Sequence, residues 1–272
     1  MTGDGGEVRI RTGITKVTAD DIVVRGYRLT EDLVGHFSFT DAFFLQMTGR
    51  RPAERESRLF EALMVNSMEH GINHPVLVAR LTHGAAPETI QAAIAAGILG
   101  MGSVGDGAIE LVADLLYGLA QTADAEAIAD EAAAARLVAE HRASRRIIPG
   151  LGHAMHKQAD PRVGRLFALV RELGFGGRYV ALMHHVASQV ALATGRDLPI
   201  NGAAAVAAAY CELGLPAKIA KAVTVVSICA GVTGHLMEEM RDPQARNMRR
   251  LISGATDFRP DEATETRTVK GK

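Results

Sequence analysis

Three stretches of this sequence carry apolar or small residues almost all the way round a helical wheel. They cover residues 88–100, 179–194 and 202–234, and few polar side chains interrupt them. A helix without a polar face must be covered on most of its sides. One domain of ordinary size does not easily cover so many such helices. We therefore expect an obligate homodimer joined by a large helix-on-helix interface.

Most of the remaining sequence also has helical periodicity. Two short β-branched stretches, residues 9–17 and 22–24, come first and predict a small hairpin or meander. From Ser38 onward, apolar spacing and capping residues predict an all-α fold. The polar residues 256–272 lack that spacing, and we expect a disordered tail there. Besides helices that begin near Ser38 and His74, the pattern predicts helices over residues 54–69, 87–99, 107–119, 123–142, 161–173, 178–194, 202–213, 216–240 and 242–253.

Charge and composition exclude several classes of partner. The 272 residues carry a formal net charge of −1, which gives no bulk electrostatic reason to bind nucleic acid or an anionic membrane. No uninterrupted apolar run looks long enough to span a bilayer, and the N-terminus lacks a secretory signal pattern. Cys211 and Cys229 lie far apart in apolar helical patterns. We expect a cytoplasmic protein with neither a nucleic-acid nor a membrane partner.

One segment carries specific chemistry. Residues 149–165 read PGLGHAMHKQADPRVGR, which places His153 directly after two closely spaced glycines. Gly150 and Gly152 allow the backbone to approach a ligand closely. Pro161 suits the first turn of a helix, whose positive end favours anions, and Arg162 supplies a forked donor for a carboxylate.

This segment resembles the signature of the citrate synthase superfamily, in which Gly-x-Gly-His is followed by a Lys and then by Asp-Pro-Arg. The order of the other segments over residues 9–252 is similar to the short, citryl-CoA lyase-like branch. The resemblance implies a two-domain, all-α, citrate synthase-like fold with a small N-terminal β-meander. It implies a large, dimer-forming domain of residues 9–118 and 199–255, and a small domain of residues 119–198 that carries the glycine loop.

The same resemblance assigns roles to residues of the loop. His153 would bind and polarise the carbonyl or hydroxyl of the acid half of the substrate, and Arg162 would hold its carboxylate. The backbone of Gly150, Leu151 and Gly152, together with Lys157, would face the adenine and phosphates of coenzyme A. The alternative is an ordinary loop whose His and Arg are structural.

A second segment, Glu69-His70-Gly71-Ile72-Asn73 before Val78-Ala79-Arg80, resembles the family's His-Gly run. The resemblance implies that His70 binds the keto acid or its carboxylate. His70 and His74 also have the four-residue spacing of a metal pair. Gly71 and Pro75 interrupt the helix that such a pair needs, so a plain helix-end pair is the better alternative.

Three positions depart from the family pattern. The family uses a His before Gly-Gly-Ala, where this chain has Gly105-Asp106-Gly107-Ala108, and a catalytic Asp where it has Ala203. Ile228 replaces an Arg that grips a second carboxylate. Gly105 still offers a backbone N–H, and we hypothesise that Asp106 replaces the missing base. The alternative is that Asp106 caps the next helix.

The leading hypothesis is an enzyme that makes or breaks a carbon–carbon bond between an acyl-CoA and a 2-keto acid, with a 3-hydroxyacyl-CoA similar to citryl-CoA as the joined form. A coenzyme A thioester is then a substrate, and no metal or redox cofactor is implied. Two alternatives stay open. One is a CoA-thioester-binding homologue or regulatory subunit without turnover, and the other is a hydrolase or lyase acting on a bulkier, more apolar catabolic thioester.

Overall fold

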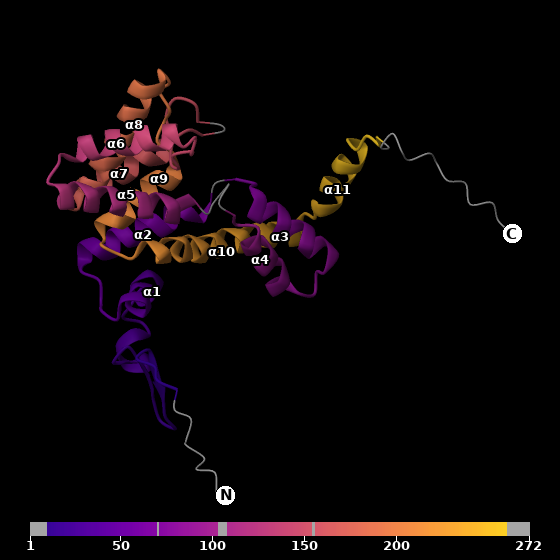
Figure 1. Cartoon of the computed structure of the whole chain (residues 1–272). Helices are drawn as coiled ribbons and strands as arrows, with labels where there is room; N and C mark the ends of the chain where they lie inside the picture. The colour runs from indigo at the N-terminus through magenta and orange to yellow at the C-terminus, as the bar shows by residue number, and fades with distance from the viewer. Residues whose placement is uncertain (1–9, 70, 103–107, 154–155, 260–272) are drawn as a thin grey trace, which may run out of the picture. The chain divides into compact units, whose positions relative to one another are not determined.

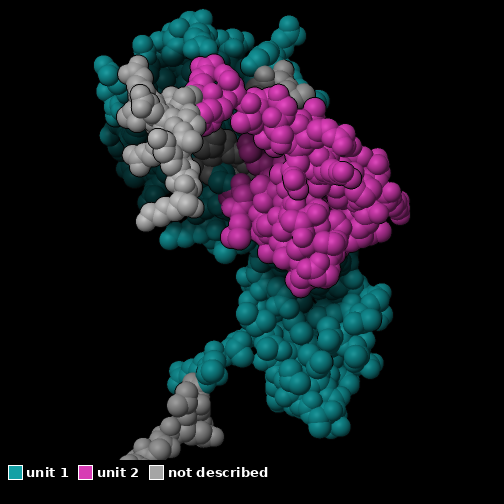
Figure 2. Space-filling model, turned by 90° about the vertical axis from the view of Figure 1, so that its right-hand side faces the viewer, with its two compact units in different colours: residues 1–70, 102–228 teal, residues 71–101, 229–272 magenta. Residues whose placement is uncertain are grey.

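The computed structural model describes residues 10–69, 71–102, 108–153 and 156–259, which form helices joined by short loops after a small N-terminal sheet (Figure 1). This confirms the predicted fold class. The chain divides into two compact units, residues 1–70 with 102–228 and residues 71–101 with 229–272, coloured separately in Figure 2. The predicted domains of residues 9–118 with 199–255 and 119–198 stay a prediction. Most of the predicted tail, residues 260–272, lies outside the described residues.

The N-terminal sheet has three short antiparallel strands in the order β1-β2-β3: Thr15–Val17, Ile22–Val24 and Tyr27–Arg28. Arg25 and Gly26, both with positive φ (51° and 88°), form the two-residue turn between β2 and β3. Such a turn matches the twist of a tight hairpin. The third strand, only two residues long, was not predicted. A π-helical turn, Leu29–Leu33, follows it.

Capping residues explain the ends of two helices in the unit of residues 1–70 and 102–228. The Ser38 hydroxyl accepts a hydrogen bond from the Asp41 N–H and begins α1, and Gly49 ends it with φ of 78°. Asp160 caps the start of α7 in the same way. The unit contains α1 (Phe39–Thr48), α2 (Glu54–Met68), α5 (Ala108–Glu126), α6 (Asp130–Ala143), α7 (Pro161–Glu172), α8 (Arg178–Thr194), α9 (Gly202–Glu212) and the first half of α10 (Ala217–Arg241).

The predicted single helix over residues 123–142 is wrong. The stretch divides into α5, which ends at Glu126, and α6, which begins at Asp130, because Ala127 adopts a left-handed conformation with φ of 51°. The guanidinium of Arg178 in α8 binds Asp124 before the break and Asp130 after it, each at 2.8 Å. Propensity favours a continuous helix here, and this tertiary ion pair across the corner opposes it.

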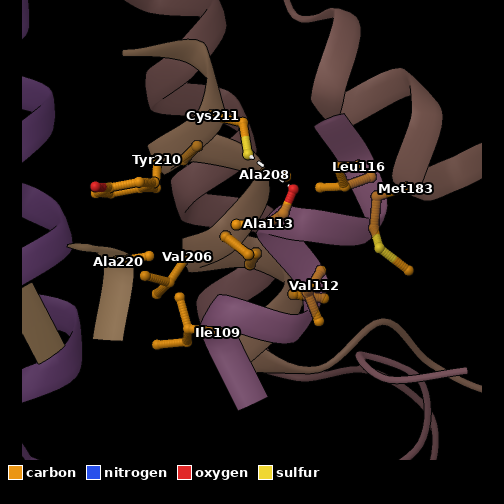
Figure 3. Packing of buried hydrophobic residues seen from close by; sticks show 14 of the residues in the cluster. Ile109, Val112, Ala113, Leu116, Met183, Val206, Ala208, Tyr210, Cys211 and Ala220 are labelled. Atoms are coloured by element: carbon orange, nitrogen blue, oxygen red, sulfur yellow. Dashed lines mark hydrogen bonds between the residues drawn. The ribbon is translucent and has the colours of Figure 1, made fainter. Parts of the chain in front are cut away.

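The core of this unit surrounds α9. Every residue of α9 from Ala204 to Cys211 is buried, and neighbouring side chains come from α5, α8 and α10 (Figure 3). The Cys211 Sγ lies 3.9 Å from the Ala113 carbonyl oxygen, and burial raises the pKa of this thiol to about 12. Since its own chain covers α9, this helix no longer supports the argument for a subunit interface.

The second unit contains α3 (His74–Ala85), α4 (Ile90–Leu99), the second half of α10 and α11 (Ala245–Gly254). Helices α3 and α4 pack closely, since a Cβ on Gly97 would lie 2.8 Å from the Pro75 carbonyl oxygen. By length and composition, α10 could cross a bilayer, a test that the core helices of globular proteins also pass. No such span was predicted from the sequence, and the absence of a membrane partner stays a prediction.

Candidate functional site

The glycine loop pairs with a distant segment of the chain. Leu151 forms an antiparallel bridge with Ile200, the Gly152 N–H donates to the Pro199 carbonyl at 2.7 Å, and the Asn201 N–H donates to the Gly150 carbonyl at 3.0 Å. These bonds satisfy the backbone of a loop that belongs to no helix. They also place the residue before His153 beside the start of α9.

Position 150 requires glycine for two reasons, its backbone conformation and the lack of space for a side chain. Its φ is 93°, and a Cβ would lie 2.8 Å from the Ala204 Cβ and 3.1 Å from a Val112 methyl. The loop backbone therefore packs directly onto α5 and α9. Gly152 also has positive φ, 81°, but a Cβ there would have open space around it.

Asn201 joins the loop to the first turn of α9. Its side-chain oxygen accepts the Ala204 N–H at 3.1 Å and caps the helix, while its amide nitrogen donates to the Gly152 carbonyl at 3.1 Å. One side chain thus fixes both the helix start and the loop that leads into His153. The positive end of α9 lies at this junction.

Asp160 and Arg162 also contact this end of α9. The Asp160 carboxylate accepts from Arg162 Nε at 2.9 Å and from Nη2 at 2.7 Å, and it also accepts the Gly202 N–H at 2.8 Å. The guanidinium lies against Gly202, since a Cβ there would be 2.4 Å from the Arg162 Cζ. Arg162 is held at the α9 terminus with only two of its five N–H groups committed to Asp160.

Asp160 is ionised in this environment. Its side chain is fully buried, and burial alone would raise the pKa of its carboxyl group. Hydrogen bonds from the Arg162 guanidinium and backbone, the positive charge of Arg162 and the Gly202 N–H outweigh burial and lower the pKa to about 2. The Asp160–Arg162 pair therefore stays charged throughout the physiological pH range.

His153 has a defined ring orientation. Its Nδ1 lies 3.0 Å from the His156 N–H and accepts its hydrogen, and the two imidazole rings lie 4.5 Å apart between centroids. A neutral ring whose Nδ1 is an acceptor carries its proton on Nε2. His153 can therefore donate a hydrogen bond through Nε2.

The structure describes only some of the predicted site residues. Lys157 Nζ donates to the His153 carbonyl at 3.2 Å, so this lysine lies at the loop. Ala203 follows Gly202 in the first turn of α9, and Ile228 is buried in α10. His70, Gly105 and Asp106 lie outside the described residues, and their roles stay predictions.

A cavity of about 1030 Å³ borders the glycine loop within the same unit. Its walls are the backbone and side chains of the loop and facing side chains of α5 and α6. Its charged residues are Asp114, Glu126, Glu140 and Arg136, and Arg136 forms ion pairs with Glu126 and Glu140. His153 and Arg162 are not among the described residues that line it. The loop residues in its wall are Ile147, Ile148, Pro149, Gly150, Leu151 and Gly152.

Sequence reasoning missed three contributors to this arrangement: Asp160 as the partner of Arg162, Asn201 as the link to the loop, and Gly202 as the surface beneath the guanidinium. Asp160 stands in the quoted motif, so its charge was a visible signal. The roles of Asn201 and Gly202 depend on contacts across about forty to fifty residues. No local pattern reveals such contacts.

The described residues contain no group of three or more His, Cys, Asp or Glu side chains that could hold a metal ion. His74, which was considered with His70 as a possible metal-binding pair, is the first residue of α3. The expectation that the chain needs no metal stays a prediction.

Comparison with known proteins gives one family. Residues 17–252 match the family model described as citrate synthase, C-terminal domain. A citrate synthase from Heyndrickxia coagulans is 24% identical over 227 residues, and a 2-methylcitrate synthase from Shewanella oneidensis is 27% identical over 248 residues. These matches cover 83% and 87% of this chain. The chain spans about 60% of the length of these relatives (58% and 61%).

Solved structures of related enzymes also resemble this chain. A citryl-CoA lyase from Hydrogenobacter thermophilus is 30% identical, with a TM-score of 0.82 over 95% of this chain and 97% of that one. An ATP citrate lyase from Methanothrix soehngenii, in complex with citrate and coenzyme A, has a TM-score of 0.77 at 17% identity. The match covers 94% of this chain and 42% of that chain, and it shows the shared fold.

Proposed function

This chain belongs to the citrate synthase family, and we propose that it makes or breaks a carbon–carbon bond between an acyl-CoA and a 2-keto acid. The joined compound would be a 3-hydroxy-3-carboxyacyl-CoA similar to citryl-CoA. The family membership and the full-length likeness to a citryl-CoA lyase support this choice.

One observation carries the proposal. The N-terminus of α9 holds the loop before His153 through Asn201, and it holds Arg162 through the Gly202 backbone and Asp160. An imidazole and a guanidinium therefore project from segments fixed to one helix end. A helix N-terminus and an arginine together favour a carboxylate, and an organic acid bearing a keto or hydroxyl group beside its carboxylate matches that pair.

His153 would act on the oxygen that changes between ketone and alcohol. With Nδ1 accepting from the His156 N–H, Nε2–H donates to that oxygen. In the bond-forming direction this donor polarises the keto group and stabilises the alkoxide that develops. In the cleavage direction the same nitrogen would accept the hydroxyl proton in the neutral tautomer whose proton lies on Nδ1, which gives an imidazolium and requires Nδ1 to give up the hydrogen bond from the His156 N–H.

Arg162 would hold the carboxylate of the acid half. Its Nε and one Nη2 hydrogen bind Asp160, which leaves the remaining N–H groups as donors for the substrate. The ion pair fixes the guanidinium before the substrate arrives, so little ordering is needed on binding.

Coenzyme A would bind along the glycine loop. The cavity of about 1030 Å³ is large enough for an adenine and part of a pantetheine chain, and the backbone of residues 149–152 forms one wall. Lys157, next to the same loop, would contact a phosphate. The related ATP citrate lyase structure, which holds citrate and coenzyme A, supports coenzyme A as part of the substrate.

The proton transfer at the acyl group needs a base that Ala203 cannot supply. Asp106, outside the described residues, remains the candidate that we propose for this role. Ile228 replaces a carboxylate-binding arginine with a buried apolar side chain. We therefore expect the acid half to be a monocarboxylate, or to be bulkier and more apolar than oxaloacetate.

The missing base also favours a second candidate, a homologue that binds CoA thioesters without turnover. The apolar Ala203 side chain in the first turn of α9 is the specific observation for it. We propose a homodimer for either candidate function. Leu99 is 86% exposed and Leu251 75% exposed in the isolated chain, and a homodimer would cover such residues.

A screen of CoA thioesters, with and without 2-keto acids and read by mass spectrometry, tests the proposal. We expect one combination to give a joined or cleaved product, and we expect His153→Ala to reduce its rate by about a hundredfold or more. Thioester binding by calorimetry without any product would favour the second candidate. Equal turnover by His153→Ala would contradict the assignment of the site.

A further inference from the structure

Two imidazole rings lie side by side in the glycine loop. The ring centroids of His153 and His156 are 4.5 Å apart, and the rings are tilted by 35° to each other. Both residues are half-buried. A substrate oxygen that hydrogen-bonds His153 Nε2 would therefore lie beside the His156 ring. The reaction proposed above uses the first imidazole and leaves the second without a role.

The two rings differ in how they are held. The backbone N–H of His156 donates to His153 Nδ1 at 3.0 Å, which leaves His153 as a donor through Nε2. Within the part of the chain that the structure describes, no group forms a hydrogen bond with a ring nitrogen of His156. The His156 ring can therefore take up or release a proton without breaking a contact of the folded chain.

Cleavage of a hydroxyacyl-CoA requires a base for the hydroxyl proton. His153 can accept this proton only if it changes tautomer and gives up the hydrogen bond from the His156 N–H. While it keeps that bond, His153 Nε2–H can stabilise the oxygen as the carbonyl group forms, but Nε2 has no lone pair for the proton. Two separate side chains therefore suit the two tasks of holding the oxygen and accepting its proton.

The charged neighbours in the same motif do not suit the role of base. The Asp160 carboxylate is held by Arg162, and its pKa of about 2 makes it a weak base. Lys157 Nζ donates to a loop carbonyl at 3.2 Å, and neither an ammonium nor a guanidinium group has an acceptor. An imidazole exchanges protons readily near neutral pH, and His156 offers one beside the donor.

We propose that His156 is the catalytic acid and base for the hydroxyl proton, an inference that rests on the carbon–carbon bond reaction proposed above. In cleavage, a ring nitrogen of His156 takes the hydroxyl proton, the O–H electron pair forms the carbonyl bond, and the carbon–carbon bond breaks. The electrons of that bond pass to the acyl carbon as a thioester enolate, which the conjugate acid of the acyl-group base protonates. The His156 imidazolium then releases its proton to water.

Bond formation is the reverse of these steps. The enolate carbon attacks the keto carbon, the keto oxygen becomes an alkoxide held by His153 Nε2–H, and the His156 imidazolium protonates it. Catalytic hydrogen bonds are often long before the substrate binds, so a small rotation of the His156 side chain in the complex is enough to reach this oxygen.

Steady-state kinetics of the full-length protein test this, with the thioester and acid identified by the thioester screen. His156→Phe removes the ring nitrogens but keeps an aromatic ring beside His153 and the backbone N–H. We expect it to lower kcat in both directions by about a hundredfold while KM changes by less than about twofold. His156→Ala should lose about as much. His36→Phe, which replaces an exposed histidine before α1, is the matched control and should equal the parent.

A positioning role would give a different pattern. If His156 only packs against His153, His156→Phe should keep the parent kcat and only His156→Ala should lose it, and that result would overturn the proposal. A raised KM with an unchanged kcat would also overturn it. Circular dichroism and calorimetry with the acid show whether each variant keeps the fold and the acid site. His156→Gln, which keeps a polar side chain without a proton-accepting nitrogen, replaces His156→Phe if that variant does not fold.

The kinetics also separate the role of His156 from the reaction on which it rests. If the parent gives product and His156→Phe gives it at the same rate, only the role of His156 is contradicted. If no thioester gives product with the parent, the proposed reaction and the role of His156 are both contradicted.

Discussion

The carboxylate of Asp160 holds the guanidinium of Arg162 at two points, with Nε at 2.9 Å and Nη2 at 2.7 Å. The same carboxylate binds the first N–H of α9 at Gly202. Asp160 is therefore the residue that ties a candidate substrate-binding arginine to the framework of the fold.

Replacing Asp160 with Asn should remove a pH-dependent part of the stability. The pKa of this carboxyl group is about 2 in the folded chain and near 3.9 when unfolded, so its contribution is complete above about pH 5. That contribution, about 2 kcal/mol, is lost as the pH falls toward 2. Urea unfolding at pH 6 and pH 3 should show a larger difference for the parent than for Asp160→Asn. The exposed Asp257→Asn is the control, and an unchanged pH dependence in Asp160→Asn would contradict the prediction.

Gly202→Ala should displace Arg162. The new methyl group would lie 2.4 Å from the Arg162 Cζ, so the guanidinium must move and its ion pair must weaken. We expect the free energy of unfolding to fall by about 1–3 kcal/mol and the KM for the acid substrate to rise. Gly164→Ala is the control: it lies within α7, where a Cβ would meet open space, and it should be neutral or slightly stabilising. A Gly202→Ala variant as stable and active as the parent would show that this contact is unimportant.

The two glycines of the loop should respond differently to alanine. Gly150→Ala combines positive φ with a 2.8 Å approach to the Ala204 Cβ, and we expect a loss of about 3 kcal/mol. Gly152→Ala meets only the backbone strain, so about 1–2 kcal/mol should be lost. Thermal or urea unfolding of both variants measures the difference. Equal losses would mean that packing against α9 does not fix the loop.

The two cysteines should differ in reactivity. Cys211 is fully buried beside α5, and burial raises the pKa of its thiol to about 12, so little thiolate exists at pH 8. Cys229 is half-buried, and burial raises the pKa of its thiol less strongly. Iodoacetamide labelling of the folded protein, followed by mass spectrometry, should modify Cys229 slowly and Cys211 hardly at all. Denatured protein should label at both. Rapid labelling of native Cys211 would contradict the packing around α9.

Local sequence signals predicted the type of most elements. Ser38 and Gly49 mark the ends of α1, and Pro161 marks the start of α7, because capping depends on neighbouring residues. The break at Ala127 was missed because Arg178, about fifty residues away, stabilises it through ion pairs.

The start of α11 was placed three residues too early. It begins at Ala245, where the distant Glu239–Arg80 pair supplies the acceptor for the first N–H groups.

The candidate site likewise contains some residues that the sequence predicts and others that it does not. His153 and Arg162 could be found from their spacing in one segment, because their residue types and the glycine turn carry the chemistry. The contribution of Asn201 and Gly202 depends on the Leu151–Ile200 bridge, which forms only when the chain folds.

A crystal structure of the protein with coenzyme A and the keto or hydroxy acid identified by the thioester screen would test the central claim most directly. We predict a carboxylate oxygen within about 3 Å of the Arg162 guanidinium and the keto or hydroxyl oxygen at a similar distance from His153 Nε2. We also predict that the adenine lies against the backbone of residues 149–152. An acid bound elsewhere, or His153 and Arg162 facing separate spaces with no ligand between them, would contradict it.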